Sequence, residues 1–226
     1  MKKIIIMGAS SGLGLELSKV FMEKGYEVIG LSRTKPELAI THIPIDFTDK
    51  ESIIIAGKKI KEKYSDFSCI ISCAGIGYIE KLDNIDFDHS DEMFRVNILG
   101  QSYLLSELSL LIKENNADLV FIGATIAYKG DEFMPMYSVT KWGLRGLIEN
   151  WKLQFKQTSC RVMGIHLGGL NTESNIGENG RGKNISQLTG KTLGIMLDTN
   201  TISNFIFSLT QLPKNMEVSE IIINRK

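Results

Sequence analysis

The chain has 226 residues, of which 43% are hydrophobic and 23% are charged, and its 26 basic residues balance 26 acidic ones. A chain of this length and composition can bury a large core without disulfides or structural metal ions, and its apolar content excludes a disordered protein. The zero net charge lacks the basic excess of a protein that binds nucleic acid regardless of sequence.

The cysteines and the apolar runs indicate the cellular setting. Cys69, Cys73 and Cys160 cannot form a fully paired set of disulfides and have no partner at zinc-ligand spacing, so we expect free thiols and no metal site. The apolar run Ile4–Met7 is shorter than the about 7–15 residues of a secretory signal, and no later run reaches the roughly 18 residues of a membrane helix. These features predict a cytoplasmic protein with no membrane and no nucleic-acid partner.

Short apolar runs with β-strand character alternate with segments of helical apolar spacing along most of the chain. The predicted elements are, in chain order, a strand at Ile4–Met7, a helix from Leu13 that ends at Gly25, strands at Val28–Leu31 and His42–Ile45, a helix opened by a capping box of Thr48 and Glu51, a strand at Phe67–Ser72, a helix from Asp91 to about Asn115, a strand at Leu119–Gly123, a helix from Tyr137 to Phe155, and strands at Val162–Leu167 and Ile221–Ile223. This alternation predicts an α/β fold with a doubly wound, mostly parallel sheet of seven strands and helices on both faces.

No Pro-rich or Ser-rich linker, internal repeat or low-complexity tract interrupts the alternation, so we expect one domain over residues 1–226. The segment Asn171–Gly190 is rich in Gly, Asn and Ser and short of large apolar residues, which is typical of a mobile surface loop. A loop after a late strand borders the ligand crevice of a doubly wound fold. We therefore expect a substrate loop at about residues 171–195.

A glycine-rich turn joins the first predicted strand to the first predicted helix. Its sequence is Gly8-Ala9-Ser10-Ser11-Gly12-Leu13-Gly14. Glycines let backbone N–H groups approach a ligand closely, and the start of a helix adds the positive end of its dipole. The strand before the turn and the amphipathic helix after it are the context of a phosphate-binding turn, so a pyrophosphate is the predicted guest.

The spacing Gly-x-x-x-Gly-x-Gly resembles the turn of the short-chain dehydrogenase/reductase family, in its single-domain Rossmann-fold branch. Further motifs follow in the family's order: Asp46 after the third strand like its adenine-contacting Asp, Ser72-Cys73-Ala74-Gly75 in place of Asn-Asn-Ala-Gly, Asn97 in place of its relay Asn, Tyr137 to Lys141 as Tyr-x-x-x-Lys, and Gly168 to Thr172 as Pro-Gly-x-x-Thr without the Pro. Each motif alone is a weak signal. Their common order over nearly the whole chain carries the resemblance.

The resemblance implies a nicotinamide cofactor, and the end of the second predicted strand indicates which one. An acidic residue there would bind the ribose 2′-hydroxyl of NAD, whereas this chain has Arg33, which can pair with a 2′-phosphate. We therefore predict NADP(H) in preference to NAD(H). By position in the family's motifs, the predicted cofactor contacts are Gly8, Ser10, Ser11, Gly12, Leu13, Gly14, Arg33, Asp46, Phe47, Cys73, Ala74, Gly75, Tyr137, Lys141, Gly169, Leu170 and Thr172.

Tyr137 and Lys141 lie four residues apart on a predicted helix, so their side chains share one face. A free tyrosine is too weak an acid to exchange protons readily near neutral pH, and a neighbouring ammonium favours the phenolate. The resemblance implies that Tyr137 gives a proton to a carbonyl oxygen as a hydride reaches the carbon. It also implies that Lys141 holds the nicotinamide ribose and that Asn97 holds a water that feeds the proton relay.

One catalytic position departs from the family pattern. The family usually places a Ser 13 residues before the Tyr to hydrogen-bond the substrate carbonyl, and this chain has Ala124 there, followed by Thr125. Losing such a donor costs on the order of 10²–10³ in rate. Three interpretations stay open: Thr125 turns its hydroxyl inward, which we favour slightly; a polar group of the substrate, or Tyr137 with water, replaces the donor; or the chain binds cofactor with little or no turnover, as a sensor or partner subunit.

The candidates to line a substrate site are Ile126, Tyr128, Phe133, Met134, Gly77 and the loop from Glu173 to Gly190. They predict a modest, mainly apolar ketone or aldehyde as the substrate. Arg181 and Lys183 in the loop are interpreted as solvated charges in preference to an anion site. The resemblance implies a homodimer or homotetramer that associates through the helices of Asn97 and Tyr137. Together these inferences predict an NADPH-dependent oxidoreductase that reduces the carbonyl of a small molecule.

Overall fold

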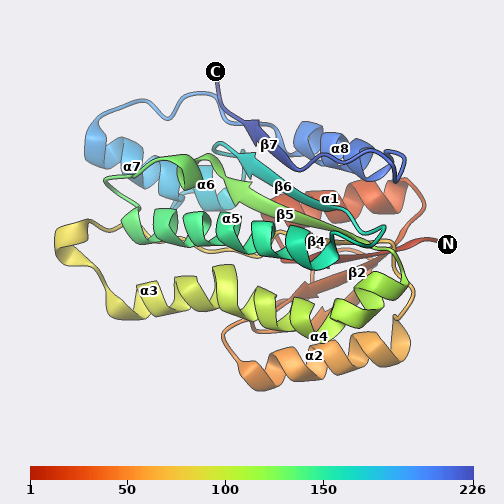
Figure 1. Ribbon diagram of the computed structural model, residues 1–226. Coiled ribbons are helices and arrows are strands. Elements are labelled where there is room, and N and C mark those ends of the chain that lie inside the picture. The colour runs from red at the N-terminus through yellow and green to blue at the C-terminus, as the bar shows by residue number, and fades with distance from the viewer.

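All seven predicted strands are present in the computed structural model, which describes residues 1–226 (Figure 1). The strands are β1 (Lys3–Met7), β2 (Glu27–Ser32), β3 (Thr41–Pro44), β4 (Cys69–Ser72), β5 (Asp118–Ala124), β6 (Val162–Leu167) and β7 (Glu220–Ile223). They form one sheet in the order β3-β2-β1-β4-β5-β6-β7, and every neighbouring pair is parallel. The doubly wound α/β prediction is confirmed, and the sheet is parallel throughout.

Helices cover both faces of the sheet, as Figure 1 shows. One face carries α1 (Gly12–Glu23) and α8 (Thr199–Thr210), and the other carries α2 (Lys50–Lys63), α4 (Gly100–Glu114) and α5 (Pro135–Phe155). Successive side chains of a strand point to opposite faces. Ile4 and Ile6 therefore join the core beneath α1 and α8, whereas Ile5 and Met7 join the core beneath α2, α4 and α5. None of the helices combines the length and the apolar character that a membrane span requires.

The start of α2 differs from the predicted capping box. Asp49 is the N-cap, and its carboxylate accepts hydrogen bonds from the backbone N–H groups of Glu51 and Ser52 at 3.1 and 3.3 Å. Thr48 instead donates its hydroxyl to the carboxylate of Asp46 at 2.7 Å. The prediction that Thr48 caps this helix is wrong because a carboxylate two residues earlier in the chain engages its side chain first.

The long helix predicted from Asp91 begins earlier and contains an irregular turn. A short 3₁₀ turn, η1 (Leu82–Asn84), precedes α3 (Phe87–Phe94), which continues through a π-helical turn, η2 (Arg95–Leu99), into α4. Asp86 caps α3 by accepting a hydrogen bond from the backbone N–H of His89 at 2.9 Å. Asn97 lies inside the π-helical turn, a geometry that occurs often at functional sites.

The segment predicted as an irregular loop is partly helical. It contains α6 (Glu173–Ile176) and α7 (Arg181–Thr189), which lie at the carboxyl edge of the sheet (Figure 1). Both helices are polar and have no buried residue, so they lack the apolar stripe from which a helix is predicted. The later helix α8 was also missed, although Ile202, Ile206 and Leu209 recur at helical spacing and Asp198 caps it.

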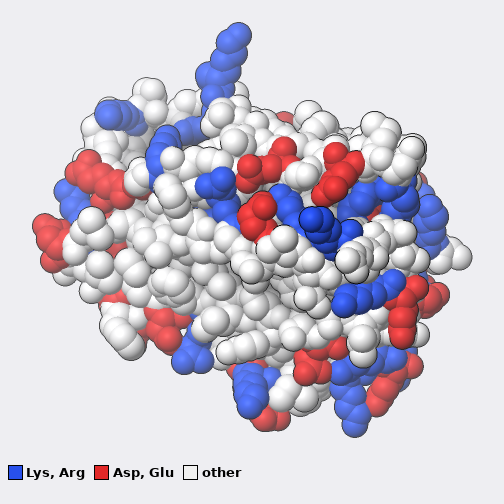
Figure 2. Space-filling view, in the orientation of Figure 1, with Lys and Arg blue, Asp and Glu red and all other residues white.

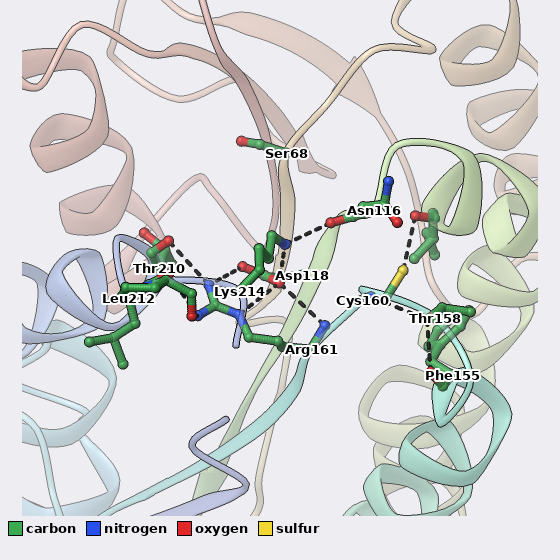
Figure 3. Close-up of polar contacts among 12 residues, drawn as sticks. Ser68, Asn116, Asp118, Phe155, Thr158, Cys160, Arg161, Thr210, Leu212 and Lys214 are labelled. Atoms are coloured by element: carbon green, nitrogen blue, oxygen red, sulfur yellow. Dashed lines mark hydrogen bonds and ion pairs between the residues drawn. The ribbon is translucent and has the colours of Figure 1, made fainter. Parts of the chain in front are cut away.

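A buried ion cluster closes the amino edge of the sheet (Figure 3). The guanidinium of Arg161 pairs with the carboxylate of Asp118 at 2.6 Å, and both side chains are almost fully buried. Arg161 also donates to the main-chain carbonyls of Thr210, the last residue of α8, and Leu212, and Lys214 pairs with Asp118 at 2.6 Å. The cluster therefore ties the connection between α8 and β7 to the first residue of β5.

Candidate active site

A cavity of about 740 Å³ opens at the carboxyl edge of the sheet. The strand order reverses between β1 and β4 at this edge, which is where ligands bind in doubly wound folds. Every predicted cofactor contact lines this cavity, as do Ala124 and Thr125. Asn97 is the exception among the predicted site residues, because it is fully buried behind the wall.

The glycine-rich turn forms one side of the cavity. Gly8 and Gly12 have φ angles of +84° and +52°, which side chains other than glycine rarely adopt. A Cβ on Gly14 would lie 2.1 Å from the carbonyl oxygen of Gly8, so the helix can start this close to β1 only with a glycine there. Ser11 precedes α1, whose first turn has no acidic residue, so its free N–H groups fit a pyrophosphate.

The predicted ribose end contains three charged groups. Arg33 has 62% of its side chain exposed and lies 3.8 Å from the Glu92 carboxylate of α3. Partial burial acts to raise the pKa of Asp46, but hydrogen bonds from the backbone and hydroxyl of Thr48 and the charge of Arg33 outweigh it and hold that pKa below its usual value. Asp46 is therefore an anion held in a fixed orientation near an exposed cation.

The wall behind the cavity is built from amide side chains of the helix that carries Asn97. Asn97 accepts a hydrogen bond from the backbone N–H of Ile76 at 2.8 Å and donates to the Ile76 carbonyl and the Thr140 hydroxyl. Gln101, one turn later, donates to the carbonyls of Ala74 and Val96 at 2.8 Å and accepts from the Ser72 hydroxyl. Both side chains hold the segment after β4 in place, and Gln101 was missed although it interrupts an apolar helical stripe.

Tyr137 and Lys141 meet on the inner face of α5. The Lys141 ammonium lies 5.6 Å from the centre of the Tyr137 ring, and only 5% of the residue is exposed. Its one acceptor in the chain is the Ile122 carbonyl, at 3.4 Å. A Cβ on Gly75 would lie 3.4 Å from both the Lys141 ammonium and the Asn97 amide oxygen, so these groups converge on the same glycine. A buried ammonium with three donors and one acceptor fits a hydroxyl-rich ligand.

Ala124 ends β5 and Thr125 starts the 3₁₀ turn η3 (Thr125–Tyr128). Both residues line the cavity, and Thr125 also borders a smaller adjoining cavity formed with the C-terminal segment. Ser138 donates its hydroxyl to the carbonyls of Ile126 and Lys129, which fastens η3 to α5. The turn that carries Thr125 is thus held against the helix that carries the tyrosine.

Cys73 lies under the predicted nicotinamide end of the cavity. Burial raises the pKa of Cys73 to about 12, although the charge of Lys141 acts in the opposite direction. The side chain is therefore a neutral thiol at physiological pH and contributes packing, because the thiolate is the reactive form.

The cavity wall on the substrate side agrees only in part with the sequence candidates. Ile126, Phe133 and Met134 line the cavity, whereas Gly77, which lies against the Tyr137 ring, is not among the residues that line it. Tyr128 does not line it, because its ring packs edge-on against buried His166. The expectation that Tyr128 contacts substrate is therefore wrong.

The structure also adds one residue that the sequence did not single out, Glu92, and gives another, Arg181, a different position from the one expected. Glu92 reaches Arg33 from α3, and the guanidinium of Arg181 enters the cavity from α7. Nothing in the sequence around either residue predicts its contact, because each contact joins a helix to a residue far away along the chain. Arg181 was interpreted as a solvated charge, and its position in the cavity corrects that interpretation.

Comparison with known proteins places this arrangement among dehydrogenases. Residues 2–184 match the family model of the short chain dehydrogenases. An uncharacterised oxidoreductase of Schizosaccharomyces pombe is 26% identical over 178 residues, which are 75% of this chain and 61% of that relative's length. The chain thus matches less than two thirds of that relative.

Two solved structures share the fold. An alcohol dehydrogenase of the archaeon Thermococcus sibiricus, complexed with 5-hydroxy-NADP, is 21% identical and has a TM-score of 0.82 over 98% of this chain and 95% of its own. A 4-hydroxyisoleucine dehydrogenase complexed with NADH is 22% identical and has a TM-score of 0.85 over 99% of this chain and 97% of its own. Likeness at this identity concerns the fold, whereas function depends on the residues of the site.

Proposed function

The chain belongs to the short-chain dehydrogenase family of oxidoreductases, and on that premise we propose that it reduces a ketone or aldehyde of a small molecule with NADPH. The observation that carries the proposal is the convergence of Tyr137, Lys141 and Asn97 at one end of a cavity whose other side is a glycine-rich turn. This arrangement joins a proton donor, a cation that stabilises its phenolate and a pyrophosphate site within one cavity.

The chemistry of the proposed reaction is divided between cofactor and protein. NADPH, when bound, supplies the hydride. Tyr137 donates its hydroxyl proton to the carbonyl oxygen, so that the carbonyl becomes an alcohol and a phenolate remains. Lys141 would stabilise that phenolate by its charge, and its two unused donors would be available to the ribose hydroxyls. The Asn97 side chain is engaged by Ile76 and Thr140, so the relay water that the family resemblance implies would be left to its main chain.

The preference for NADPH rests on Arg33. No carboxylate stands at the end of β2, and the guanidinium of Arg33 is exposed with Glu92 as a distant partner at 3.8 Å. A doubly charged 2′-phosphate is a stronger partner for a guanidinium than a carboxylate at that distance. Glu92 would repel the same phosphate, so it is expected to moderate the preference.

The alternative function is a nucleotide-binding protein with little or no turnover. The observation that favours it is the methyl group of Ala124 at the end of β5, where a hydroxyl donor is expected. Without that donor, the developing negative charge on the carbonyl oxygen has fewer hydrogen bonds. The two functions differ in one measurable quantity, the rate of carbonyl-dependent NADPH oxidation.

The first prediction concerns Tyr137. NADPH oxidation is measured against a panel of ketones and aldehydes with the wild-type chain and with Tyr137→Phe. We expect the substitution to lower kcat by at least about 10²-fold and to leave the Kd of NADPH within about twofold, because the ring stays and only the proton donor is lost. Tyr103→Phe on the exposed face of α4 is the control and is expected to keep wild-type kcat. Tight NADPH binding with no carbonyl turned over by the wild type would favour the alternative function.

The second prediction concerns Arg33. Arg33→Ala should raise the Kd of NADPH by about 10–100-fold and that of NADH by less than about threefold, because only NADPH carries the 2′-phosphate. Fluorescence titration with both nucleotides measures these constants. Lys35→Ala, on the same loop and outside the cavity, is the matched control. Equal losses for both nucleotides contradict the assignment.

We further propose a homodimer or homotetramer that uses α4 and α5. Figure 2 shows that the middle of this face carries few charged side chains. Large apolar side chains are exposed there: Leu99, Tyr103, Leu110, Val139, Trp142 and Leu153. Apolar patches of this kind mark surfaces of association, and light scattering measures the oligomeric state directly.

A further inference from the structure

We propose that the substrate carries an oxyanion group, a carboxylate or a phosphate, and that Arg181 binds it beside the reacting carbonyl. This inference deepens the proposed function and rests on it for the position of the carbonyl. The sequence predicted a mainly apolar substrate. The position of one guanidinium in the cavity is the reason to expect a charged one.

Arg181 reaches the proton donor across the cavity. It is the first residue of α7, and its guanidinium carbon lies 5.4 Å from the centre of the Tyr137 ring. A molecule whose carbonyl oxygen accepts a proton from Tyr137 therefore lies within a few bonds of this cation. No other arginine or lysine comes this near the tyrosine ring except Lys141, which is on the proposed ribose side.

Gly77 provides the space for this approach. A Cβ on Gly77 would lie 2.6 Å from the Arg181 guanidinium, 2.8 Å from the Tyr137 ring and 3.0 Å from the methyl group of Met134. The segment after β4, the start of α5 and the start of α7 thus meet around this glycine. These contacts are with residues on the substrate side and not with the glycine-rich turn that faces the proposed pyrophosphate.

Arg181 has no anionic partner within the chain. Its one hydrogen bond is to the amide oxygen of Asn175 at 3.4 Å, and no carboxylate lies within salt-bridge distance. Asp131, an acidic residue that lines the cavity, accepts hydrogen bonds from the N–H groups of Phe133 and Met134 at 2.9 Å. A partly buried guanidinium with unused donors favours a planar oxyanion, which it can hold with two parallel hydrogen bonds.

The surrounding charge supports the same substrate class. Lys129, Lys191 and Arg225 also line the cavity, together with Arg33 and Lys141, whereas its acidic lining residues are Asp46 and Asp131. A cavity wall with this excess of cations raises the local concentration of anions and lowers that of cations. An oxo acid or a phosphorylated carbonyl compound is therefore favoured over an uncharged ketone.

The test compares pairs of carbonyl compounds in which one member carries an oxyanion group and the other does not. One pair is 4-oxopentanoate and its methyl ester, and the other is dihydroxyacetone phosphate and dihydroxyacetone. We expect wild-type kcat/KM to be at least about 10-fold higher for the charged member of one pair. The pair with this difference tells whether the oxyanion group of the substrate is a carboxylate or a phosphate. Arg181→Met should lower kcat/KM for that member by about 10²-fold and for its neutral partner by less than about threefold.

Two further variants separate charge from structure. Arg181→Lys keeps the cation and should restore part of the preference, whereas Lys183→Met, exposed two residues later on α7 and outside the cavity, should leave both rates within twofold of wild type. Equal losses for charged and neutral members overturn the proposal. A weaker Kd of NADPH in Arg181→Met, with the substrate preference intact, also overturns it, because it would assign the guanidinium to the cofactor.

A binding measurement makes the inference independent of turnover. Pentanoate and methyl phosphate carry an oxyanion but no carbonyl, and their binding to the NADP⁺-saturated protein is followed by ligand-observed NMR. Binding that is lost in Arg181→Met and kept in Lys183→Met supports the anion site even if no carbonyl is reduced, in which case only the proposed function fails. Binding that is absent, or equal in wild type and Arg181→Met, overturns the anion site and leaves the proposed function standing if the neutral members are reduced.

Discussion

Ala124 presents a methyl group at the end of β5, and its neighbour Thr125 presents a hydroxyl at the start of η3. Both line the cavity, and the hydrogen bonds of Ser138 hold the turn beside α5. A donor that is held rigidly stabilises the carbonyl oxygen more than one that must be ordered during the reaction. These positions are the basis for the proposal that Thr125 replaces the missing serine.

The prediction at this scale is that Thr125→Val lowers kcat by about 10²-fold without changing the Kd of NADPH, because valine keeps the shape and removes the hydroxyl. Steady-state kinetics with the best carbonyl of the panel measure the effect. The matched variant Ala124→Ser should change kcat by less than about threefold. A large gain in Ala124→Ser together with no loss in Thr125→Val would instead place the carbonyl against residue 124.

Among the elements, β6 shows how strands and helices are fitted around one buried side chain. His166 lies in the middle of β6 and is fully buried, with its ring over Gly123 of β5, where a Cβ would lie 2.2 Å from Nδ1. Tyr128 of η3 packs edge-on against the ring, and Glu220 of β7 lies 3.2 Å from Nε2. The imidazole therefore contacts residues of β5, η3 and β7. Arg145 of α5 stacks on Tyr128, with its guanidinium carbon 3.9 Å from the ring centre, so α5 joins the same group of contacts.

The charge state of His166 leads to a prediction about pH. Burial lowers the pKa of His166 below its usual 6.5, with Arg145 and Lys141 acting in the same direction and Glu220 against them. As the pH falls through about 6.5, the unfolded chain takes up a proton that the folded chain does not. The free energy of unfolding should therefore fall between pH 7.5 and 5.5, by at most about 1.4 kcal/mol per pH unit from this group.

Urea unfolding of the wild type and His166→Gln over this pH range measures the effect. The variant should be less stable at pH 7.5, because the cavity fits an imidazole, but its stability should depend less on pH. His89→Gln, on the surface of α3, is the control and should keep the wild-type slope. Identical slopes in wild type and His166→Gln would contradict the assignment.

The whole molecule is divided between the two edges of its sheet. The carboxyl edge carries the cavity, the glycine-rich turn and the proposed catalytic residues. The amino edge carries the ion cluster of Asp118, Arg161 and Lys214 shown in Figure 3. Changes at the amino edge should therefore affect stability without altering the chemistry.

This division predicts that Asp118→Asn lowers the free energy of unfolding by about 3–5 kcal/mol, because it leaves the buried Arg161 guanidinium without its counter-ion. Urea unfolding gives the loss, and the Kd of NADPH for the folded protein should stay within twofold. Glu62→Gln, in the exposed pair with Lys58, should change stability by less than about 1 kcal/mol. If Asp118→Asn does not fold, Lys214→Met, which removes only the outer cation, should show a smaller loss than 3 kcal/mol.

Much of the fold could be predicted from local sequence. Most of the strands are largely apolar runs, and the helices that pack on them carry apolar stripes, so Ile4–Met7 and the pattern around Leu104 and Leu108 identify their elements without knowledge of the neighbours. The wrong predictions concern polar segments and positions where two residues could serve. Asp49, and not Thr48, is the N-cap of α2, and α7 has no buried residue from which to predict it.

The sequence by itself determined where the strands lie along the chain, the glycine-rich turn and the spacing of Tyr137 and Lys141 on one helix, because each depends on residues a few positions apart. Only the tertiary structure decided that Arg181 faces Tyr137, that Glu92 reaches Arg33 and that Tyr128 turns away to His166. Such contacts join residues tens of positions apart, and the packing of helices on the sheet, which no local pattern encodes, sets their distances.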